Sequence, residues 1–148
     1  GATLFQGYRR TETRFIARYA DGWFHSADLG RVDDLRQLHL LGRCDRMFIS
    51  GGENLHPEAI EAALLSLNGV LEAVVVARDD REFGHRPVAF VTLMPGEDWS
   101  PARLLATLAE RLPRYALPVA ILPLPDSARS GLKPDLRRLT ALAADHAR

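Results

Sequence analysis

The sequence contains very little cysteine, and it lacks a net charge and a long apolar run. Its acidic and basic residues balance at 19 each, so no overall field favours nucleic acid as a partner. No apolar stretch approaches the ~20 residues of a membrane span, so we expect none. The single cysteine, Cys44, cannot form an internal disulfide, which favours a reducing compartment and predicts a cytoplasmic protein.

Further absences exclude several kinds of site. The Gly-x-Ser-x-Gly motif of serine hydrolases is missing. The phosphate loop Gly-x-x-x-x-Gly-Lys-Ser/Thr is also missing, because Gly51 and Gly52 lack its spacing. The five histidines are scattered and accompany one cysteine, so no zinc pattern is present. We therefore predict no metal site in this chain.

Lysine is the scarcest cation: Lys133 is the one lysine beside 18 arginines. It lies in the stretch Ser-Gly-Leu-Lys-Pro at residues 130–134. A compact ammonium on a flexible stem suits the approach to a phosphate or to a developing negative charge. Composition alone leaves open whether Lys133 is functional or is simply the one basic position without arginine in an arginine-rich chain. The residues around it are needed to distinguish these two interpretations.

The 148 residues fit one domain, or one domain and a piece of another. Residues 1–42 are strand-rich, and Asp33 and Asp34 predict a hairpin turn between strands at 29–32 and 36–41. Leu38 and Leu40 alternate with polar residues, which predicts a half-buried strand. Because the chain begins with Gly1, we expect a fragment, a trimmed form or a tag remnant.

Residues 43–148 predict the order β, α, β, β, α, β, α and thus an α+β domain. The expected elements are a strand at 47–49, a glycine loop at 50–54, a helix from Pro57 with Gly69 as its C-cap, strands at 70–78 and 88–94 around a charged turn at 79–86, a helix from Pro101 capped by Ser100, a strand at 119–122, a loop at 126–131, and a helix from Pro134 to about residue 144.

Small polar positions occur in a distinctive order along these elements. Residues 21–30 read Asp-Gly-Trp-Phe-His-Ser-Ala-Asp-Leu-Gly, residues 42–61 begin Gly-Arg-Cys-Asp and contain Ser-Gly-Gly-Glu-Asn, and residues 130–133 read Ser-Gly-Leu-Lys. This order resembles the C-terminal end of the adenylate-forming (ANL) superfamily, which includes acyl-CoA synthetases, luciferases and adenylation domains of peptide synthetases. Within it, residues 82–89 and the Gly-Leu-Lys spacing most resemble the o-succinylbenzoate–CoA ligases of menaquinone biosynthesis.

The resemblance implies a fold and a reaction. Residues 43–148 would be the small, mobile C-terminal domain, with short β-sheets flanked by about three helices. Residues 1–42 would be a β-rich tail of the large adenylation domain. The full-length enzyme would be an AMP-forming acyl-CoA ligase that uses ATP, Mg²⁺ and CoA and proceeds through an acyl-adenylate. The isolated chain would be inactive and would bind none of these cofactors tightly.

The resemblance also implies roles for particular residues. Asp28 would accept hydrogen bonds from the ribose hydroxyls of ATP, and Arg43 would assist there. Asp45 would be the hinge about which the small domain rotates. Lys133 would stabilise the anionic transition state of adenylation.

The resemblance also implies a role for two glycines, and the sequence differs from the superfamily pattern at two places. Gly51 and Gly52 would line the channel for the pantetheine thiol of CoA, where a side chain would obstruct the passage. Ala27 stands where the superfamily has glycine, and Ser-Gly-Leu-Lys contains one residue more than the usual Ser-Gly-Lys.

The sequence leaves other functions and partners open. The chain could instead be a stand-alone module that binds CoA or a carrier protein, or part of an adenylation domain that loads a carrier protein. Its expected partners are the absent N-terminal adenylation domain and either CoA or an acyl-carrier protein. Strands in residues 1–42 without their parent domain predict self-association or disorder there.

Overall fold

Two long antiparallel strands, β9 (Val70–Asp80) and β10 (Gly84–Leu93), form the centre of the structure, a computed structural model that describes residues 8–11, 14–16, 19–20 and 23–146. Most of their apolar residues are buried, on both faces of the sheet, although Leu71 at the start of β9 is exposed. Successive side chains of a strand point to opposite faces. Accordingly, Val75 belongs to one hydrophobic cluster, and Val74 and Val76 belong to the other.

Three shorter strands complete the central sheet. β7 (Phe48–Ser50) pairs antiparallel with β8 (Glu53–Leu55) and meets β10 at Gly84. β11 (Ala120–Pro123) runs parallel to β10 and pairs with the edge of β10 opposite to β9. The charged segment 79–86, predicted as a turn, instead extends both long strands, and only residues 81–83 form the turn.

Three helices cover this sheet within the described residues: α1 (Pro57–Leu65), α2 (Pro101–Ala109) and α3 (Leu136–Asp145). Ile60, Leu64, Leu104 and Leu108 of α1 and α2 pack in the cluster that contains Val75, whereas α3 packs in the other. The α+β prediction is therefore confirmed, and none of these helices is long and apolar enough to cross a membrane.

The helix ends partly differ from the predicted ones. Ser100 caps α2 as predicted, because its hydroxyl accepts a hydrogen bond from the backbone N–H of Arg103. The final helix begins at Leu136 rather than at Pro134, since the carboxylate of Asp135 provides the N-cap. The predicted C-cap at Gly69 was wrong: α1 ends at Leu65 with Ser66 as its C-cap, and Gly69 follows with a positive φ of 86°.

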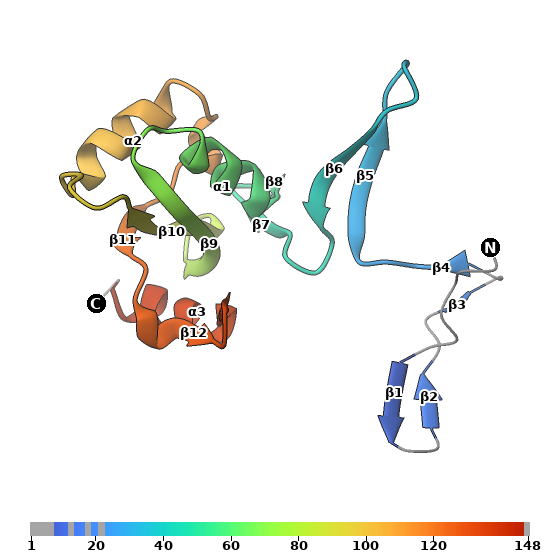
Figure 1. The fold of residues 1–148 in the computed structure, drawn as a ribbon. Helices are drawn as coiled ribbons and strands as arrows, with labels where there is room; N and C mark the ends of the chain where they lie inside the picture. The colour runs from blue at the N-terminus through green and yellow to red at the C-terminus, as the bar shows by residue number, and fades with distance from the viewer. Residues whose placement is uncertain (1–7, 12–13, 17–18, 21–22, 147–148) are drawn as a thin grey trace.

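Three hairpins precede the sheet and extend away from it (Figure 1). They are formed by β1 (Tyr8–Thr11) and β2 (Arg14–Ile16), by β3 (Tyr19–Ala20) and β4 (Trp23–Phe24), and by β5 (Asp28–Val32) and β6 (Leu38–Arg43). Residues 1–7, 12–13, 17–18 and 21–22 lie outside the described residues. The first motif begins there, and part of the prediction of self-association or disorder also falls there.

The last of these hairpins confirms the predicted turn but not the predicted burial. The Asp33 carboxylate accepts hydrogen bonds from the N–H groups of Leu35 and Gln37 and closes the turn. Leu38 and Leu40 were expected to be half-buried, yet they are 66% and 73% exposed. Their period-two pattern is real, but no second layer formed by the described residues covers these two side chains.

Candidate functional site

Three predicted site residues lie together at the open end of the last hairpin. Asp28 and Arg43 are register partners in β5 and β6. Nε and Nη2 of Arg43 donate to the two carboxylate oxygens of Asp45, each at 2.8 Å, and Nη1 donates to Oδ1 of Asp28 at 3.3 Å. The guanidinium therefore links a carboxylate of the hairpin, Asp28, to a carboxylate of the segment that joins the hairpin to the central sheet, Asp45. We call residues 44–46 of this segment the junction. We call Asp28, Arg43 and Asp45 the arginine cluster.

The electrostatics of the arginine cluster follow from this geometry. The hydrogen bond from Arg43 lowers the pKa of Asp45, and the same bond raises the pKa of Arg43. About half of each side chain is exposed: 45% for Arg43, 48% for Asp28 and 58% for Asp45. The Asp45 carboxylate therefore remains ionised, and both carboxylates are open to a polar ligand.

Arg46, which the sequence did not single out, attaches the junction to the main body. Its guanidinium donates to Glu58 at 3.2 Å, to Glu61 at 2.6 and 3.1 Å, and to the carbonyl of Val75 at 3.1 Å. Glu61 also accepts the N–H of Val75. The partners of Arg46 lie on α1 and β9, distant in sequence, so no local motif indicated them.

The end of β6 also packs against the first turn of α1. The backbone N–H of Arg43 donates to Glu58 at 3.3 Å. A Cβ on Gly42 would lie 2.5 Å from Oε2 of the same glutamate, so glycine permits this close approach. On the other side, the N–H of Cys44 donates to the carbonyl of Ala27 at 2.7 Å. The backbone thus passes from hairpin contacts to body contacts within residues 44–46.

Gly51 and Gly52 form the tight turn between β7 and β8, so the predicted loop is shorter than expected. Their φ angles are 60° and 87°, which glycine adopts without strain and which suit a two-residue hairpin turn. A Cβ on Gly52 would meet no atom within 4 Å, whereas a Cβ on Gly51 would lie 3.0 Å from the Phe83 ring, so only the Gly52 side of the turn faces open space.

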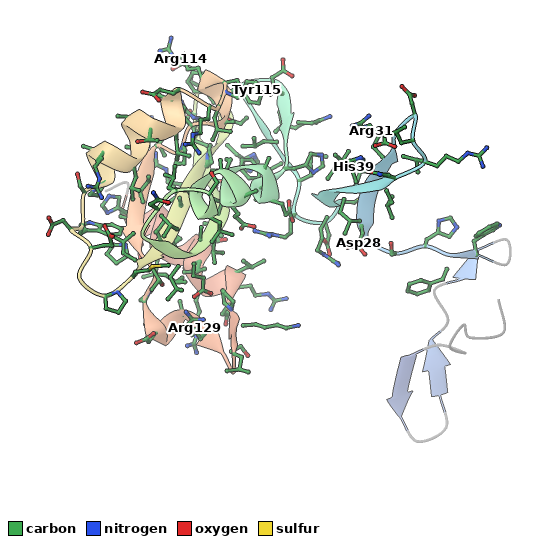
Figure 2. The ribbon with its side chains drawn as sticks, turned by 45° about the horizontal axis from the view of Figure 1, so that its top comes forward. Asp28, Arg31, His39, Arg114, Tyr115 and Arg129 are labelled. Carbon is green, nitrogen blue, oxygen red and sulfur yellow. The ribbon has the colours of Figure 1, made fainter. Side chains whose placement is uncertain are left out.

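A hollow of about 480 Å³ lies beside this turn. Two aromatic and two cationic side chains give it its character: the guanidinium of Arg86 lies 4.8 Å from the centre of the Phe83 ring, and Arg114 and Tyr115 form another part of the wall (Figure 2). Glu53 and Glu82 supply acidic groups. Flat rings and guanidinium groups together suit a ligand with an aromatic ring and phosphates.

Lys133 lies on a separate small hairpin of β12 (Arg129–Ser130) and β13 (Lys133–Pro134), beside α3 (Figure 1). Its ammonium is exposed and forms no ion pair within the described part of the chain. Leu132, the additional residue in this motif, is 96% exposed at the tip, so the insertion disturbs no packing. No hydrogen bond or ion pair joins Lys133 to the arginine cluster among the described residues.

A metal has no obvious set of ligands here. The described residues contain no group of three or more His, Cys, Asp or Glu side chains that could hold an ion. The acidic residues of the arginine cluster are instead occupied by a guanidinium.

Residues 59–131 match the family model described as the AMP-binding enzyme C-terminal domain. This part of the chain belongs to that family. The match covers most of α1 and all of β9, β10, α2, β11 and β12, and it ends two residues before Lys133. The resemblance inferred from the sequence is confirmed.

The chain is 38% identical over 138 residues to 2-succinylbenzoate–CoA ligase of Bacillus cytotoxicus. The aligned region covers 93% of this chain and 28% of that protein. Among solved structures, ATP-bound MatB from Rhodopseudomonas palustris matches with a TM-score of 0.80 at 27% identity, over 100% of this chain and 30% of that one. The o-succinylbenzoate CoA synthetase of Bacillus subtilis, in complex with the acyl-adenylate OSB-AMP, matches with a TM-score of 0.79 at 31% identity, over 94% and 28%. The chain thus spans less than a third of the length of these relatives.

Proposed function

We propose that this chain is the C-terminal portion of an ATP-dependent carboxylic acid–CoA ligase. The whole enzyme would join an acid to AMP with release of pyrophosphate, then transfer the acyl group to the thiol of CoA with release of AMP. The observation that carries the proposal is the ammonium of Lys133, which has no ion-pair partner among the described residues and lies on an exposed hairpin just after the part of the chain that matches the AMP-binding enzyme C-terminal domain. A free cation in such a place suits an anion brought by another part of the enzyme.

In this proposal the arginine cluster meets the nucleotide. The Asp28 carboxylate would accept hydrogen bonds from ribose hydroxyls, and its half-exposed side chain leaves room for them. Arg43 would hold that carboxylate in its orientation, and the remaining donor capacity of the guanidinium would face the same ligand. The cluster therefore supplies binding and orientation rather than a proton transfer.

Asp45 would be the pivot between the two catalytic poses, with residues 1–42 moving with the large domain and residues 43–148 forming the mobile domain. The contacts that surround it support this assignment. Cys44 bonds to the hairpin side, whereas Arg46 is fixed to α1 and β9. Rotation can therefore be confined to a few backbone angles at Asp45. It would keep the contacts of Arg46 and would break the hydrogen bond from the Arg43 N–H to Glu58.

Lys133 would act in the first step. Its ammonium would lie against the carboxylate of the acid and the α-phosphate, where negative charge gathers in the transition state. Rotation about Asp45 would then withdraw it. The turn of Gly51 and Gly52 would approach in the second step and line the pantetheine channel, and the hollow beside it offers Arg86 and Arg114 to the phosphates of CoA.

The remaining components would come from outside this chain. Mg²⁺ would be held by ATP and by the large adenylation domain, since the described residues provide no ligand cluster. The acid pocket would lie there too, and 2-succinylbenzoate, a precursor in menaquinone biosynthesis, is the first acid to test. We propose a cytoplasmic location, because the single cysteine of this chain, Cys44, is free and exposed.

The decisive experiment separates the two half-reactions in the full-length ligase. Lys133→Ala should slow pyrophosphate release at least about 100-fold, because a preorganised charge on the transition state is lost. Thioester formation from supplied acyl-adenylate should stay near the unaltered rate. Equal loss in both steps would contradict the role given to Lys133.

A second candidate, a module that binds CoA or a carrier protein on its own, is favoured by the hollow beside Gly51. Calorimetric titration of CoA into the isolated chain tests it. Heat that disappears in an Arg86→Ala, Arg114→Ala double variant would support this module. The ligase proposal predicts in addition that the isolated chain, mixed with acid, ATP and CoA, forms no AMP.

A further inference from the structure

Lys133 lies on a hairpin that is too small to fix its own orientation. β12 and β13 pair at two register positions, Arg129 with Pro134 and Ser130 with Lys133. Isolated two-stranded ladders are marginal in water. In the described part of the chain, this one forms a sheet of its own, separate from the five-stranded sheet. The direction of the lysine therefore depends on what holds the base of the hairpin.

One side chain at the base reaches the central sheet. Nη1 of Arg129 donates to Oε1 of Glu72 at 3.3 Å, and Nη2 donates to Oε2 at 2.5 Å. Glu72 belongs to β9, 57 residues earlier in the chain. Two parallel bonds from one guanidinium fix the angle of approach as well as the distance. About a quarter to a third of each side chain is exposed, so water screens the pair only in part.

The other contacts close the base of the hairpin beside α3 and do not reach β9. The N–H of Asp135 donates to the carbonyl of Ala128 at 2.8 Å, and Arg138 donates to the carbonyl of Ser127 at 2.7 Å. These bonds join the start of α3 to the turn before β12. Asp126 lies 3.9 Å from Nε of Arg129 but is fully exposed, so it adds little. Among the described residues, the fork between Arg129 and Glu72 is thus the side-chain link from the base of the lysine hairpin to β9.

We propose that Arg129 and Glu72 are a positioning pair that aims Lys133. The part of this inference that concerns adenylation rests on the proposed function. Without the fork, the hairpin samples other orientations about its base, and the ammonium is misplaced relative to the reacting anions. A misplacement of about 1 Å in a catalytic arrangement can cost about 100-fold in rate. The pair matters for the step that uses Lys133 and not for the step from which the lysine is withdrawn.

The first test uses the chain itself and is independent of activity. Because Lys133 is the single lysine, ¹⁵N-lysine labelling gives one backbone amide signal from it. The heteronuclear NOE of this signal should fall in Arg129→Ala and in Glu72→Gln, fall less in Arg129→Lys, and recover in the reversed pair Glu72→Arg with Arg129→Glu. Arg103→Ala, which removes an exposed pair with Glu97 at 3.8 Å, is the matched control and should leave it unchanged. An unchanged NOE in Arg129→Ala overturns the proposal.

The second test uses the full-length ligase and both half-reactions. Arg129→Ala should slow adenylation about tenfold to 100-fold and spare thioester formation from supplied acyl-adenylate. In a Lys133→Ala background the same change should add no further loss, since Arg129 acts through the lysine. If Lys133→Ala leaves adenylation intact, the proposed function fails, and the NOE still decides on the pair. If Lys133→Ala abolishes adenylation while Arg129→Ala has no effect, or slows both steps equally, the positioning role alone fails.

Discussion

The hairpin of β5 and β6 and the hairpin of β9 and β10 are both antiparallel ladders rich in aliphatic residues, yet they have opposite surroundings. Val75 and Val88 on the long strands are buried, because helices cover both faces of their sheet. Leu38 and Leu40 on the short hairpin are exposed, because nothing in the described residues covers them. Strands with the same kind of aliphatic side chains therefore form a buried core in one region and an exposed surface in the other. The uncovered hairpin is the part that we assign to the large domain of the ligase.

The largest expected difference between the two regions is in the free energy of unfolding that is lost when a leucine in each is replaced by alanine. Leu108→Ala should lower the free energy of unfolding by about 2–5 kcal/mol, because it leaves a cavity in a fully buried site. Leu40→Ala should change it by less than about 0.5 kcal/mol, because that side chain is 73% exposed. Urea titrations followed by circular dichroism measure both. Similar losses would mean that the hairpin is covered in solution, and would break the comparison.

The boundary between the regions should show the next largest effect. Glu61→Gln weakens the bonds to the Arg46 guanidinium and to the N–H of Val75, inside a site where both side chains are mostly buried. We expect a loss of about 2 kcal/mol in the free energy of unfolding. Glu97→Gln, at the exposed pair with Arg103, is the control and should cost less than about 1 kcal/mol. Equal losses would show that the Arg46 contacts do not secure the junction.

The exposed leucines lead to a third prediction, which concerns association. Val32, Leu35, Leu38 and Leu40 are 61–78% exposed on one hairpin, and apolar patches of this kind favour burial against another surface. In the absence of the large domain, we expect the isolated chain to self-associate through them. Sedimentation velocity should show dimers or larger species whose share falls in the Leu38→Gln, Leu40→Gln double variant. A wild-type chain that stays monomeric at high concentration would contradict this.

What the sequence could predict was local in nature. Pro57 and Ser100 marked helix starts through their own backbone chemistry, and Gly51 and Gly52 marked a turn that needs positive φ. Arg43 and Asp45 are only two positions apart in the sequence, so their proximity could also be expected. The prediction was wrong where a distant partner decides the outcome, as in the exposure of Leu40.

Long-range pairs account for the site residues that the sequence did not reveal. Arg46 bonds to Glu61 15 residues away, and Arg129 bonds to Glu72 57 residues away. In a chain with 18 arginines, no pattern distinguishes these two from the others. Their importance follows from where the fold places them: one beside the proposed hinge, and the other at the base of the lysine hairpin.

The smallest expected effect is a pH dependence confined to the turn of the uncovered hairpin. The hydrogen bond from His39, at 2.7 Å, and the backbone N–H groups of the turn hold the pKa of Asp33 below its usual 3.8. A carboxyl whose pKa is lowered by folding stabilises the folded turn above its unfolded pKa, and this contribution is lost as pH falls through the lowered value. The amide shifts of Leu35 and Gln37 should therefore change together below pH 3.8, while the amides of β9 and β10 stay unchanged until global unfolding. Asp33→Asn should abolish the transition at the turn. A transition shared by both hairpins would mean that they unfold as one unit, and that the two regions are less independent than their burial indicates.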